Sequence, residues 1–389
     1  MSTKVKLIRT ATVSMSLNYL LRGQLSFLKN QYEVIAVSGD DDNLKVVSDR
    51  EKVRTVSVNM ERSISPFVDL VSLWKLYLLF CKEKPSIVHS ITPKAGLLTM
   101  LAGKMAGVPI RIHTFTGLIF PTKKGLMQQL LIKMDQLLCW AATNVYPEGQ
   151  GVKNDLITYG ITKKPLKVLA NGNVNGIDCD FFSPEQITVI EKKNLKESLN
   201  INEGDFVFVF VGRLVGDKGI NELVDTFSQI TTHDSRLTTH KLLLVGPLES
   251  ELDPLKPITL QQIESNSNII SVGFQEDVRP YFAISNALVF PSYREGYPNV
   301  VMQAGAMELP SIVTDINGCN EIIKEGLNGI IIPVKDAKAI EIAMRRLIDD
   351  NLFYKELQSN SRKMITSRYE QQLVWEALLE EYKSLEKNV

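Results

Sequence analysis

Short runs of β-branched and aromatic residues alternate with longer stretches of helical periodicity along nearly the whole chain, and no other feature constrains its fold as strongly. This alternation predicts βαβ units that build parallel sheets. The predicted strands are residues 5–9, 34–38, 54–58, 86–90, 110–114, 144–146 and 166–169 in the first half, and 206–211, 240–245, 269–272, 287–290, 311–314 and 329–332 in the second. Helices are predicted between them, for example over residues 16–29, 67–82, 94–106 and 125–142.

The length of the chain predicts two domains, because 389 residues exceed what one hydrophobic core usually organises. Residues 183–205 are polar and lack strand character, so they mark the expected boundary. The expected fold class is α/β, with doubly wound, Rossmann-like domains over residues 1–182 and 183–364. Such domains bind ligands at the carboxyl ends of their strands, so the ligand site is expected in a cleft between the two domains.

The last segment, residues 365–389, has the pattern of an amphipathic terminal helix. Its apolar residues recur at helical spacing: Leu373, Ala377, Leu378 and Tyr382.

Composition excludes several classes of protein. The hydrophobic fraction is 44% and the charged fraction 23%, which excludes a disordered, collagen-like or disulfide-scaffold chain. The four cysteines form no C-x-x-C pair, so we expect reduced, mostly buried thiols in a cytoplasmic protein. We also expect neither a signal peptide nor a membrane-spanning helix, because no apolar run is long enough.

Charge is unevenly distributed, although the net charge is zero. Residues 1–182 carry 23 Lys and Arg against 14 Asp and Glu, whereas the remainder carries 21 against 30. Such asymmetry predicts that the first domain meets an anionic partner, such as a membrane surface or a nucleic acid. The alternative is that the two domains simply differ in charge without a binding role.

The densest motif is the turn and helix over residues 291–308. A strand is predicted to end just before it, Gly296 permits a tight turn, and Pro298 suits the first turn of a helix that starts near Asn299. Backbone amides at such a turn bind anions. Glu295 would accept hydrogen bonds from sugar hydroxyls, and Gln303, one helical turn after Asn299, would reach a ribose. The alternative is an ordinary strand–turn–helix with a solvated glutamate.

A second motif, residues 212–219, follows the predicted strand FVFVFV. Arg213 and Lys218 in this glycine-rich turn could clamp a diphosphate, Arg213 as a planar fork and Lys218 as a point charge. Its spacing is not that of a Walker A loop, and a solvated basic turn is the alternative. A third turn, at Gly246, closes another predicted strand at the same edge.

These motifs carry a family resemblance. The order G-R-L-x-x-x-K-G (212–219), V-G (245–246), G-F-x-x-D-V (273–278) and P-S-Y-R-E-G-x-P-N (291–299) resembles the retaining nucleotide-sugar glycosyltransferases of GT-B fold, family 4 (glycosyl transferases group 1). Residues 175–181 resemble the N-G-V-D-x-x-x-F stretch near that family's interdomain crossing. Residues 314–321 resemble the following turn, which ends at Glu321 near the donor. The terminal helix matches the segment that crosses back to the N-terminal domain.

The resemblance implies transfer of a sugar from a nucleotide diphosphate with retained anomeric configuration and no metal or other cofactor. Arg213 and Lys218 would neutralise the leaving diphosphate, and Glu295 would hold the donor sugar. The departing phosphate would itself deprotonate the acceptor, so no protein base is required. The implied donor-binding residues are Gly212, Gly246, Gly296, Tyr297, Pro298, Asn299, Gln303 and Glu321.

Three positions depart from the family pattern. Gln303 stands where the family has a second glutamate, which predicts altered nucleotide contacts rather than inactivity. Thr116, before Gly117, stands where many members have a histidine, and His113 lies three residues earlier as a candidate reaction-centre group or a core residue. The first turn, with Ser14 and Ser16, lacks the family's paired glycines and is a candidate acceptor contact.

The acceptor is expected on the basic first domain. Thr92 and Lys94 lie at a strand-to-helix turn, a second candidate anion site. Residues 118–124 and the helix 125–142 combine apolar bulk with lysines, which is typical of a helix that dips into an anionic bilayer; an ordinary packed helix is the alternative. This region resembles transferases that extend undecaprenyl-diphosphate-linked sugars in capsule, O-antigen or glycan assembly. We therefore expect a polyprenyl-diphosphate acceptor and a peripheral location on the inner face of the plasma membrane.

Other functions remain open from the sequence. A soluble acceptor, a nucleotide-sugar 2-epimerase and a non-catalytic nucleotide-sugar-binding protein are the alternatives. A dehydrogenase is disfavoured because no G-x-G-x-x-G follows the first strand, and nucleic-acid binding because no known module is present. The preferred donor is a UDP-linked hexose or N-acetylhexosamine, from the resemblance alone.

Overall fold

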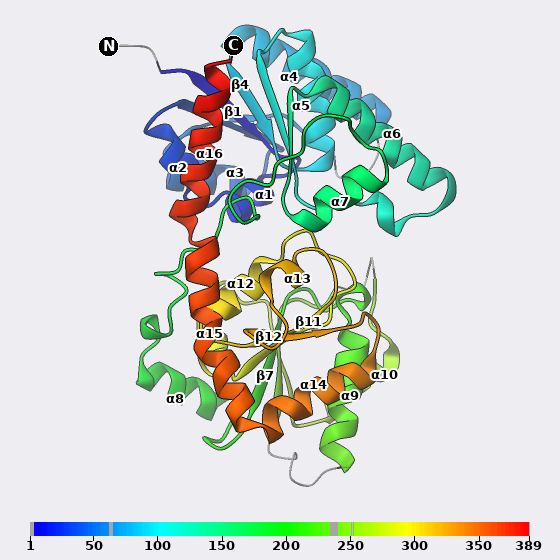
Figure 1. Ribbon diagram of the computed structural model, residues 1–389, viewed down its shortest axis with the longest axis vertical. Helices are drawn as coiled ribbons and strands as arrows, with labels where there is room; N and C mark the ends of the chain where they lie inside the picture. Colours follow the sequence, from blue (N-terminus) through cyan, green and yellow to red (C-terminus); the bar gives the residue numbers. More distant parts are fainter. Residues whose placement is uncertain (1–3, 62–64, 234–239, 250, 252, 389) are drawn as a thin grey trace. The chain divides into compact units, whose positions relative to one another are not determined.

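The computed structural model describes residues 4–388 except 62–64, 234–239, 250 and 252 (Figure 1). The chain forms two compact units. The first unit comprises the described residues up to Gly176 together with those from Gln371 onward, and the second unit is Ile177–Glu370.

These boundaries differ from the expected ones at 182 and 364, because residues 177–182 are bonded to helix α15 (Asn351–Tyr369). The amide of Ile177 donates to the carbonyl of Tyr369 at 2.7 Å. Arg362 donates to the carbonyls of Cys179 and Phe182, both at 2.8 Å. The polar segment 183–205 is therefore not the boundary; it forms a 3₁₀ turn η2 (Pro184–Gln186) and helix α8 (Val189–Ser198) within the second unit.

A six-stranded, fully parallel sheet forms the centre of the first unit, in the order β3-β2-β1-β4-β5-β6. The elements are β1 (Lys6–Thr10), α1 (Ser14–Leu20), α2 (Gln24–Lys29), β2 (Glu33–Ser38), α3 (Asp42–Glu51), β3 (Arg54–Ser57), α4 (Pro66–Glu83), β4 (Ile87–Ser90), α5 (Pro93–Met105), β5 (Ile110–Phe115), η1 (Phe120–Thr122), α6 (Gly125–Ala141), β6 (Asn144–Pro147), α7 (Gln150–Thr158) and α16 (Gln371–Glu386).

Helices cover both faces of this sheet. One core cluster joins the sheet to α1, α2, α3 and the terminal helix α16, and another joins it to α4, α5 and α6. Figure 1 shows α16 beside α2, with α4 to α6 on the other side of the sheet. The strand order reverses direction between the neighbouring strands β1 and β4, so the turns that follow them share one edge of the sheet.

The second unit repeats this architecture with the strand order β12-β11-β10-β7-β8-β9, again fully parallel. Besides η2, α8 and α15, its elements are β7 (Val207–Val211), η3 (Gly216–Lys218), α9 (Ile220–His233), β8 (Lys241–Val245), α10 (Pro257–Ser265), β9 (Ile269–Gly273), α11 (Arg279–Ala283), β10 (Ala287–Phe290), α12 (Asn299–Ala306), β11 (Ser311–Thr314), α13 (Cys319–Ile322), β12 (Gly329–Ile332) and α14 (Ala337–Asp349).

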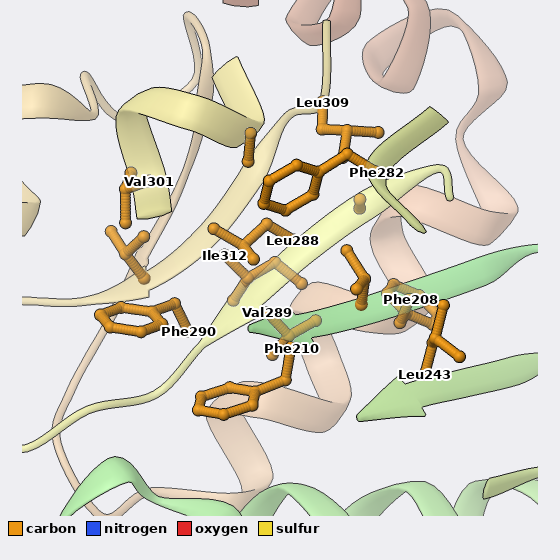
Figure 2. Packing of buried hydrophobic residues seen from close by; sticks show 14 of the residues in the cluster. Phe208, Phe210, Leu243, Phe282, Leu288, Val289, Phe290, Val301, Leu309 and Ile312 are labelled. Atoms are coloured by element: carbon orange, nitrogen blue, oxygen red, sulfur yellow. The ribbon is translucent and has the colours of Figure 1, made fainter. Parts of the chain in front are cut away.

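The core of the second unit explains why its strands are apolar without alternation. Helices cover both faces of the sheet, so Val207 to Phe210 on β7 are all completely buried. Figure 2 shows Phe208 and Phe210 of β7 among side chains of β8, β10 and β11. The rings of Phe210 and Phe290 stack with centroids 5.8 Å apart.

Twelve of the thirteen predicted strands are confirmed within a residue or two, and three predicted elements differ from the structure. Residues 166–169 form no strand, because Leu166 and Leu169 pack against the two different core clusters instead of pairing with β6. The predicted helix 16–29 is two helices that break at Gly23, where the ring of Trp375 would lie 2.7 Å from an added Cβ. The terminal segment is also interrupted, at Glu370, which bridges to Ile177.

A buried polar network attaches α16 to the first sheet. Arg9 of β1 is only 1% exposed, and its guanidinium donates to Gln24 Oε1 at 2.8 Å and to the hydroxyl of Tyr382 at 3.1 Å. The same hydroxyl lies 2.5 Å from His89 Nδ1, and the other ring nitrogen of His89 lies 2.8 Å from Thr114 Oγ1. The terminal helix is thus part of the first unit, as the resemblance implies.

Candidate active site

The motif that carries Arg213 and Lys218 and the motif that carries Glu295 follow neighbouring strands of the second sheet. β7 and β10 pair directly, with Ala287 opposite Phe208, while β8 and β11 lie outside them. The turns after β7 and β10 therefore leave the sheet at the point where the strand order reverses, which is where doubly wound sheets bind ligands. The turns after β8 and β11 flank them at the same edge.

Glycines let the backbones of these four turns approach one another. Gly246 has a φ of 147°, and a Cβ there would lie 1.8 Å from the carbonyl oxygen of Gly212. Gly318 has a φ of 76°, and a Cβ there would lie 2.4 Å from the carbonyl oxygen of Gly296. A side chain at either position would force the turns apart. The predicted donor-binding glycines 212, 246 and 296 are thus contact points between turns. Gly318, which lies within the motif 314–321 but was not among the predicted donor-binding residues, is a further one.

Lys218 and Glu295 form an ion pair at this edge, although 77 residues separate them in the sequence. The ammonium of Lys218 donates to Glu295 Oε1, and the same oxygen accepts from Ser292 Oγ at 2.8 Å. Both charged side chains are largely shielded, with 16% and 17% of their surfaces exposed. The carboxylate expected to extend toward the donor sugar is therefore held by a cation and a hydroxyl.

Arg213, the other expected clamp residue, has a different partner. Its Nη1 lies 2.7 Å from Glu249 Oε2 in the turn after β8, and its side chain is 45% exposed. A half-exposed pair of this kind contributes little to stability and exchanges readily for another anion. Arg213 is thus held at the edge of the site in a form that an anionic ligand could recruit.

Two acidic residues that the motif analysis did not single out support Lys218. The backbone amide of Asp217 donates to Asp253 Oδ2 at 2.5 Å, and Arg294 pairs with Asp217 at 3.0 Å. The amide of Tyr293 donates to the carbonyl of Asp217 at 2.8 Å. These bonds join η3, which ends at Lys218, to the turn that carries Glu295. In the sequence, Asp217 and Asp253 appear only as polar residues within predicted turns, which does not indicate that they position Lys218.

The predicted helix after Glu295 is confirmed as α12, which starts at Asn299 after the N-cap Pro298. Asn299 and Gln303 are both partly exposed on it. Tyr297 is buried instead: its hydroxyl lies 2.8 Å from that of Tyr369, and burial raises the pKa of Tyr297 well above its usual range. Its side chain anchors the turn from the core side.

Glu321 lies on α13, partly exposed. Its backbone carbonyl accepts a hydrogen bond from Arg368 at 2.8 Å, so this short helix is tied to α15.

In the first unit, Thr12 and Thr92 join the turns after β1 and β4. Their hydroxyls lie 2.8 Å apart, and the amide of Thr12 donates to Thr92 Oγ1 at 2.8 Å. Beside them opens a cavity of about 760 Å³, which we term the α5–α6 pocket. Ser16 and Lys94, two of the expected acceptor residues, line it together with Thr92.

The remaining acceptor candidates do not line the α5–α6 pocket. Ser14 is completely buried and bonded to Asp41, and Thr116 Oγ1 donates to the carbonyl of Ile91 at 2.8 Å next to Gly117. His113 is a core histidine: it is 1% exposed and its Nδ1 lies 2.8 Å from Ser90 Oγ. Burial lowers the pKa of His113 to about 3, so the ring is neutral at physiological pH.

The pocket also contains a carboxyl group that the sequence did not mark. Asp135 of α6 lines it, and burial raises the pKa of Asp135 to about 7. Asp135 could not be identified from its neighbours, because it occurs in an ordinary helical pattern. Among the described residues, no group of three or more His, Cys, Asp or Glu side chains is arranged to hold a metal ion.

Comparisons with known proteins agree with this geometry. The profile described as "Glycosyl transferases group 1" matches residues 191–364, and that described as "Glycosyl transferase 4-like domain" matches residues 24–172. The chain is 36% identical, over 96% of its length and 95% of the relative's, to the capsular polysaccharide biosynthesis glycosyltransferase CapM of Staphylococcus aureus.

Two further similarities extend over most of the chain. An Escherichia coli UDP-Gal:α-D-GlcNAc-diphosphoundecaprenol α-1,3-galactosyltransferase is 28% identical over 79% of this chain and 78% of its own. The crystal structure of Anabaena HepE in complex with UDP superimposes with a TM-score of 0.82 at 16% identity, covering 98% of this chain and all of that one. The two doubly wound sheets, the motif turns at the edge of the second and the extent of the similarity to CapM together show that the chain belongs to the glycosyl transferases group 1 family, with the GT-B fold.

Proposed function

We propose that the protein transfers a hexose or N-acetylhexosamine from a UDP-sugar, with retention of configuration, to a saccharide carried on a polyprenyl diphosphate in surface-polysaccharide synthesis. The observation that carries the donor assignment is the shielded Lys218–Glu295 pair at the reversal point of the second sheet. The E. coli relative is named for a UDP-sugar donor and a diphosphoundecaprenol acceptor, and CapM for capsule synthesis. The first name supports the proposed substrates, and the second supports the proposed role in surface-polysaccharide synthesis.

The proposed chemistry uses the charges at this edge. A donor diphosphate brings negative charge, which competes with Glu295 for Lys218 and with Glu249 for Arg213. Glu295, once released from Lys218, accepts hydrogen bonds from hydroxyls of the donor sugar. The bond between the anomeric carbon and the diphosphate oxygen breaks, the acceptor oxygen bonds to that carbon, and the acceptor proton goes to the departing phosphate. Lys218 and Arg213 stabilise the charge that develops on the leaving group.

We further propose that this reaction needs no metal ion, since two cationic side chains occupy the positions where the diphosphate charge would be neutralised. Gln303 stands one helical turn after Asn299 on α12 and replaces a carboxylate of the family pattern. An amide both donates and accepts hydrogen bonds, so Gln303 would still bind a ribose hydroxyl.

The first prediction tests the donor. UDP with EDTA should raise the melting temperature by about 5 °C at roughly 100 times its Kd, because a ligand of the folded state alone adds about 2.7 kcal/mol at that ratio. GDP, ADP, dTDP and CMP serve as controls in the same thermal-shift assay. A shift with another nucleotide only would contradict the UDP assignment. No shift with any nucleotide would contradict the donor site itself.

Because the proposed acceptor is linked to a lipid, the protein is expected to bind a membrane surface. Among the described residues, no helix has the length and apolarity required to cross a bilayer. Helix α4 nevertheless has a second apolar face. Its buried side includes Leu76 and Phe80, yet its outer side carries apolar residues at spacings of three and four, which are Phe67, Leu70, Val71, Trp74 and Leu78. We term these five residues the α4 stripe.

The surroundings of the α4 stripe favour an anionic bilayer. Helix α5 packs between α4 and α6, and α6 exposes Leu126, Leu130 and Trp140. Exposed lysines accompany both helices: Lys75 and Lys82 on α4, Lys123 and Lys124 before α6. Apolar side chains beside lysines are the pattern of a helix that lies in the membrane interface. We propose that the α4 stripe and α6 bind the inner face of the plasma membrane.

The second prediction tests this surface. The double substitution Phe67→Glu and Trp74→Glu should weaken binding to phosphatidylglycerol-containing vesicles roughly 100-fold. Each aromatic side chain that no longer inserts into the bilayer reduces the binding free energy by at least about 1.5 kcal/mol. Vesicle co-sedimentation measures the change. Val46→Glu is the control, since Val46 is 46% exposed on α3, at the other face of the sheet. Equal binding by the double variant and the control would contradict the membrane assignment.

A further inference from the structure

The α5–α6 pocket is lined by an apolar wall and by several polar side chains. Its volume of about 760 Å³ falls in the range of roughly 300–1,000 Å³ that is typical of small-molecule sites. The wall comes mainly from α6, where Met127, Leu131 and Met134 follow one another at spacings of four and three and therefore share a helix face. Leu97 of α5, Ile119, Val13 and Pro93 are the other apolar residues of the lining.

The composition of this wall suits a branched, irregular hydrocarbon. Two of the seven apolar residues that line the pocket are methionines, whose flexible thioethers adapt to irregular shapes. A saccharide would not require such a wall, because sugar hydroxyls need hydrogen-bonding partners when they leave water. The wall therefore indicates an apolar ligand segment.

Besides Asp135, the polar residues of the lining supply two cations and three hydroxyls. Lys94 is 10% exposed and is positioned by Asp69, whose Oδ1 lies 2.7 Å from its ammonium. Lys123 is exposed at the rim. The hydroxyls come from Thr12, Ser16 and Thr92. Cations and hydroxyls beside an apolar wall match a ligand whose hydrocarbon chain ends in a phosphate group.

We propose that the α5–α6 pocket binds the diphosphate of the acceptor together with its first isoprene units. The diphosphate lies at Lys94, Lys123 and the hydroxyls, and the hydrocarbon lies along Met127, Leu131 and Met134. This inference rests on the proposed function, because it takes the acceptor to be a polyprenyl diphosphate. It adds that the protein recognises the lipid itself, and not only the saccharide that the lipid carries.

Asp135 gives the pocket a second property. It lies on α6 one position after Met134, and within the described part of the chain no hydrogen bond or ion pair satisfies its carboxyl group. Lys94 of α5 and Lys123 before α6 are the other charged residues that line this pocket, and Cys139, one helical turn further on, interacts electrostatically with Asp135. Its pKa of about 7 keeps Asp135 neutral below pH 7, where it can donate a hydrogen bond to a phosphate oxygen. Above pH 7 its negative charge repels the diphosphate.

The third prediction is tested by isothermal titration calorimetry without any donor. The ligands are farnesyl diphosphate, geranyl diphosphate, inorganic diphosphate and farnesol. Farnesyl diphosphate should bind at least tenfold more tightly than geranyl diphosphate, because burying even two more carbons contributes about that factor. It should also bind more tightly than diphosphate or farnesol alone. Equal affinity for farnesyl diphosphate and inorganic diphosphate would overturn the proposal.

Matched variants locate the site. Met134→Gln should weaken farnesyl diphosphate binding about tenfold, whereas Leu137→Gln, on the exposed side of the same helix, should leave it unchanged. Lys123→Gln should weaken farnesyl diphosphate and diphosphate alike by about fivefold, whereas its neighbour Lys124, which does not line the pocket, should tolerate the same change. Equal losses within either pair would overturn the assignment to this pocket.

The variant Asp135→Asn separates the effect of titrating the Asp135 carboxyl group from the effect of titrating the diphosphate of the ligand. From pH 6 to pH 8.5 the wild-type protein should lose about fivefold more affinity for farnesyl diphosphate than this variant does. Parallel pH profiles would overturn the role of Asp135. Failure of the pocket is distinguishable from failure of the proposed function, because these titrations involve neither the donor nor turnover. A protein that binds UDP but not farnesyl diphosphate would keep its donor site and lose only this inference.

Discussion

Lys218→Ala should lower kcat about 1,000-fold while the protein stays folded. The substitution removes a shielded cation at the position where, in the proposed reaction, the leaving diphosphate gains charge, and loss of one such preorganised group typically costs 10²–10³ in rate. It also leaves the carboxylate of Glu295 with Ser292 as its remaining side-chain partner, so that carboxylate would oppose the donor diphosphate. The rate is measured from UDP release with a lipid-linked saccharide acceptor at saturating donor.

The control for this prediction is Lys338→Ala. Lys338 forms a surface ion pair with Glu341 on α14 of the same unit and is 72% exposed, so its loss should change neither rate nor stability measurably. Circular dichroism and the melting temperature of both variants verify folding. A Lys218→Ala enzyme that keeps more than a tenth of the wild-type kcat would show that the second sheet's edge is not the donor site.

Tyr382→Phe should destabilise the first unit by about 3 kcal/mol, although it removes a single oxygen atom. That hydroxyl bonds both Arg9 and His89, and all three side chains are buried. Leaving buried polar groups without a partner costs about 1–3 kcal/mol each, and more for a charged one. Arg9 would retain Gln24, and His89 would retain Thr114. Urea denaturation followed by circular dichroism measures the loss.

Tyr19→Phe is the matched control, since Tyr19 is 56% exposed on α1 of the same unit. The same chemical change there should alter the free energy of unfolding by less than about 0.5 kcal/mol. If both variants unfold at the same urea concentration as the wild type, the buried network does not attach α16. A loss confined to Tyr382→Phe would show that the terminal helix contributes to the stability of the first unit.

The order of the elements was readable from the sequence, because hydrophobic periodicity is local. The run FVFVFV predicted a strand of a parallel sheet, and β7 is completely buried from Val207 to Phe210. Turn chemistry was equally local: Pro298 before Asn299 predicted the start of α12 at the residue where it begins. The interruptions within the predicted helix 16–29 and within the terminal helical segment were not predicted from the sequence. At the break, Gly23 is in close contact with Trp375, which comes from the other end of the chain.

The amino-acid sequence was sufficient to predict an α/β chain, motif turns that follow strand ends, and the residue types that those turns carry. Which of these residues come into contact depends on the three-dimensional packing. It paired Lys218 with Glu295 across 77 residues and Arg9 with Tyr382 across 373. It also buried His113 in the core and placed Asp135 at a pocket wall. Periodicity and turn preferences act between neighbours in the chain, whereas ion pairing and desolvation depend on distances in space, which strand order and helix packing set.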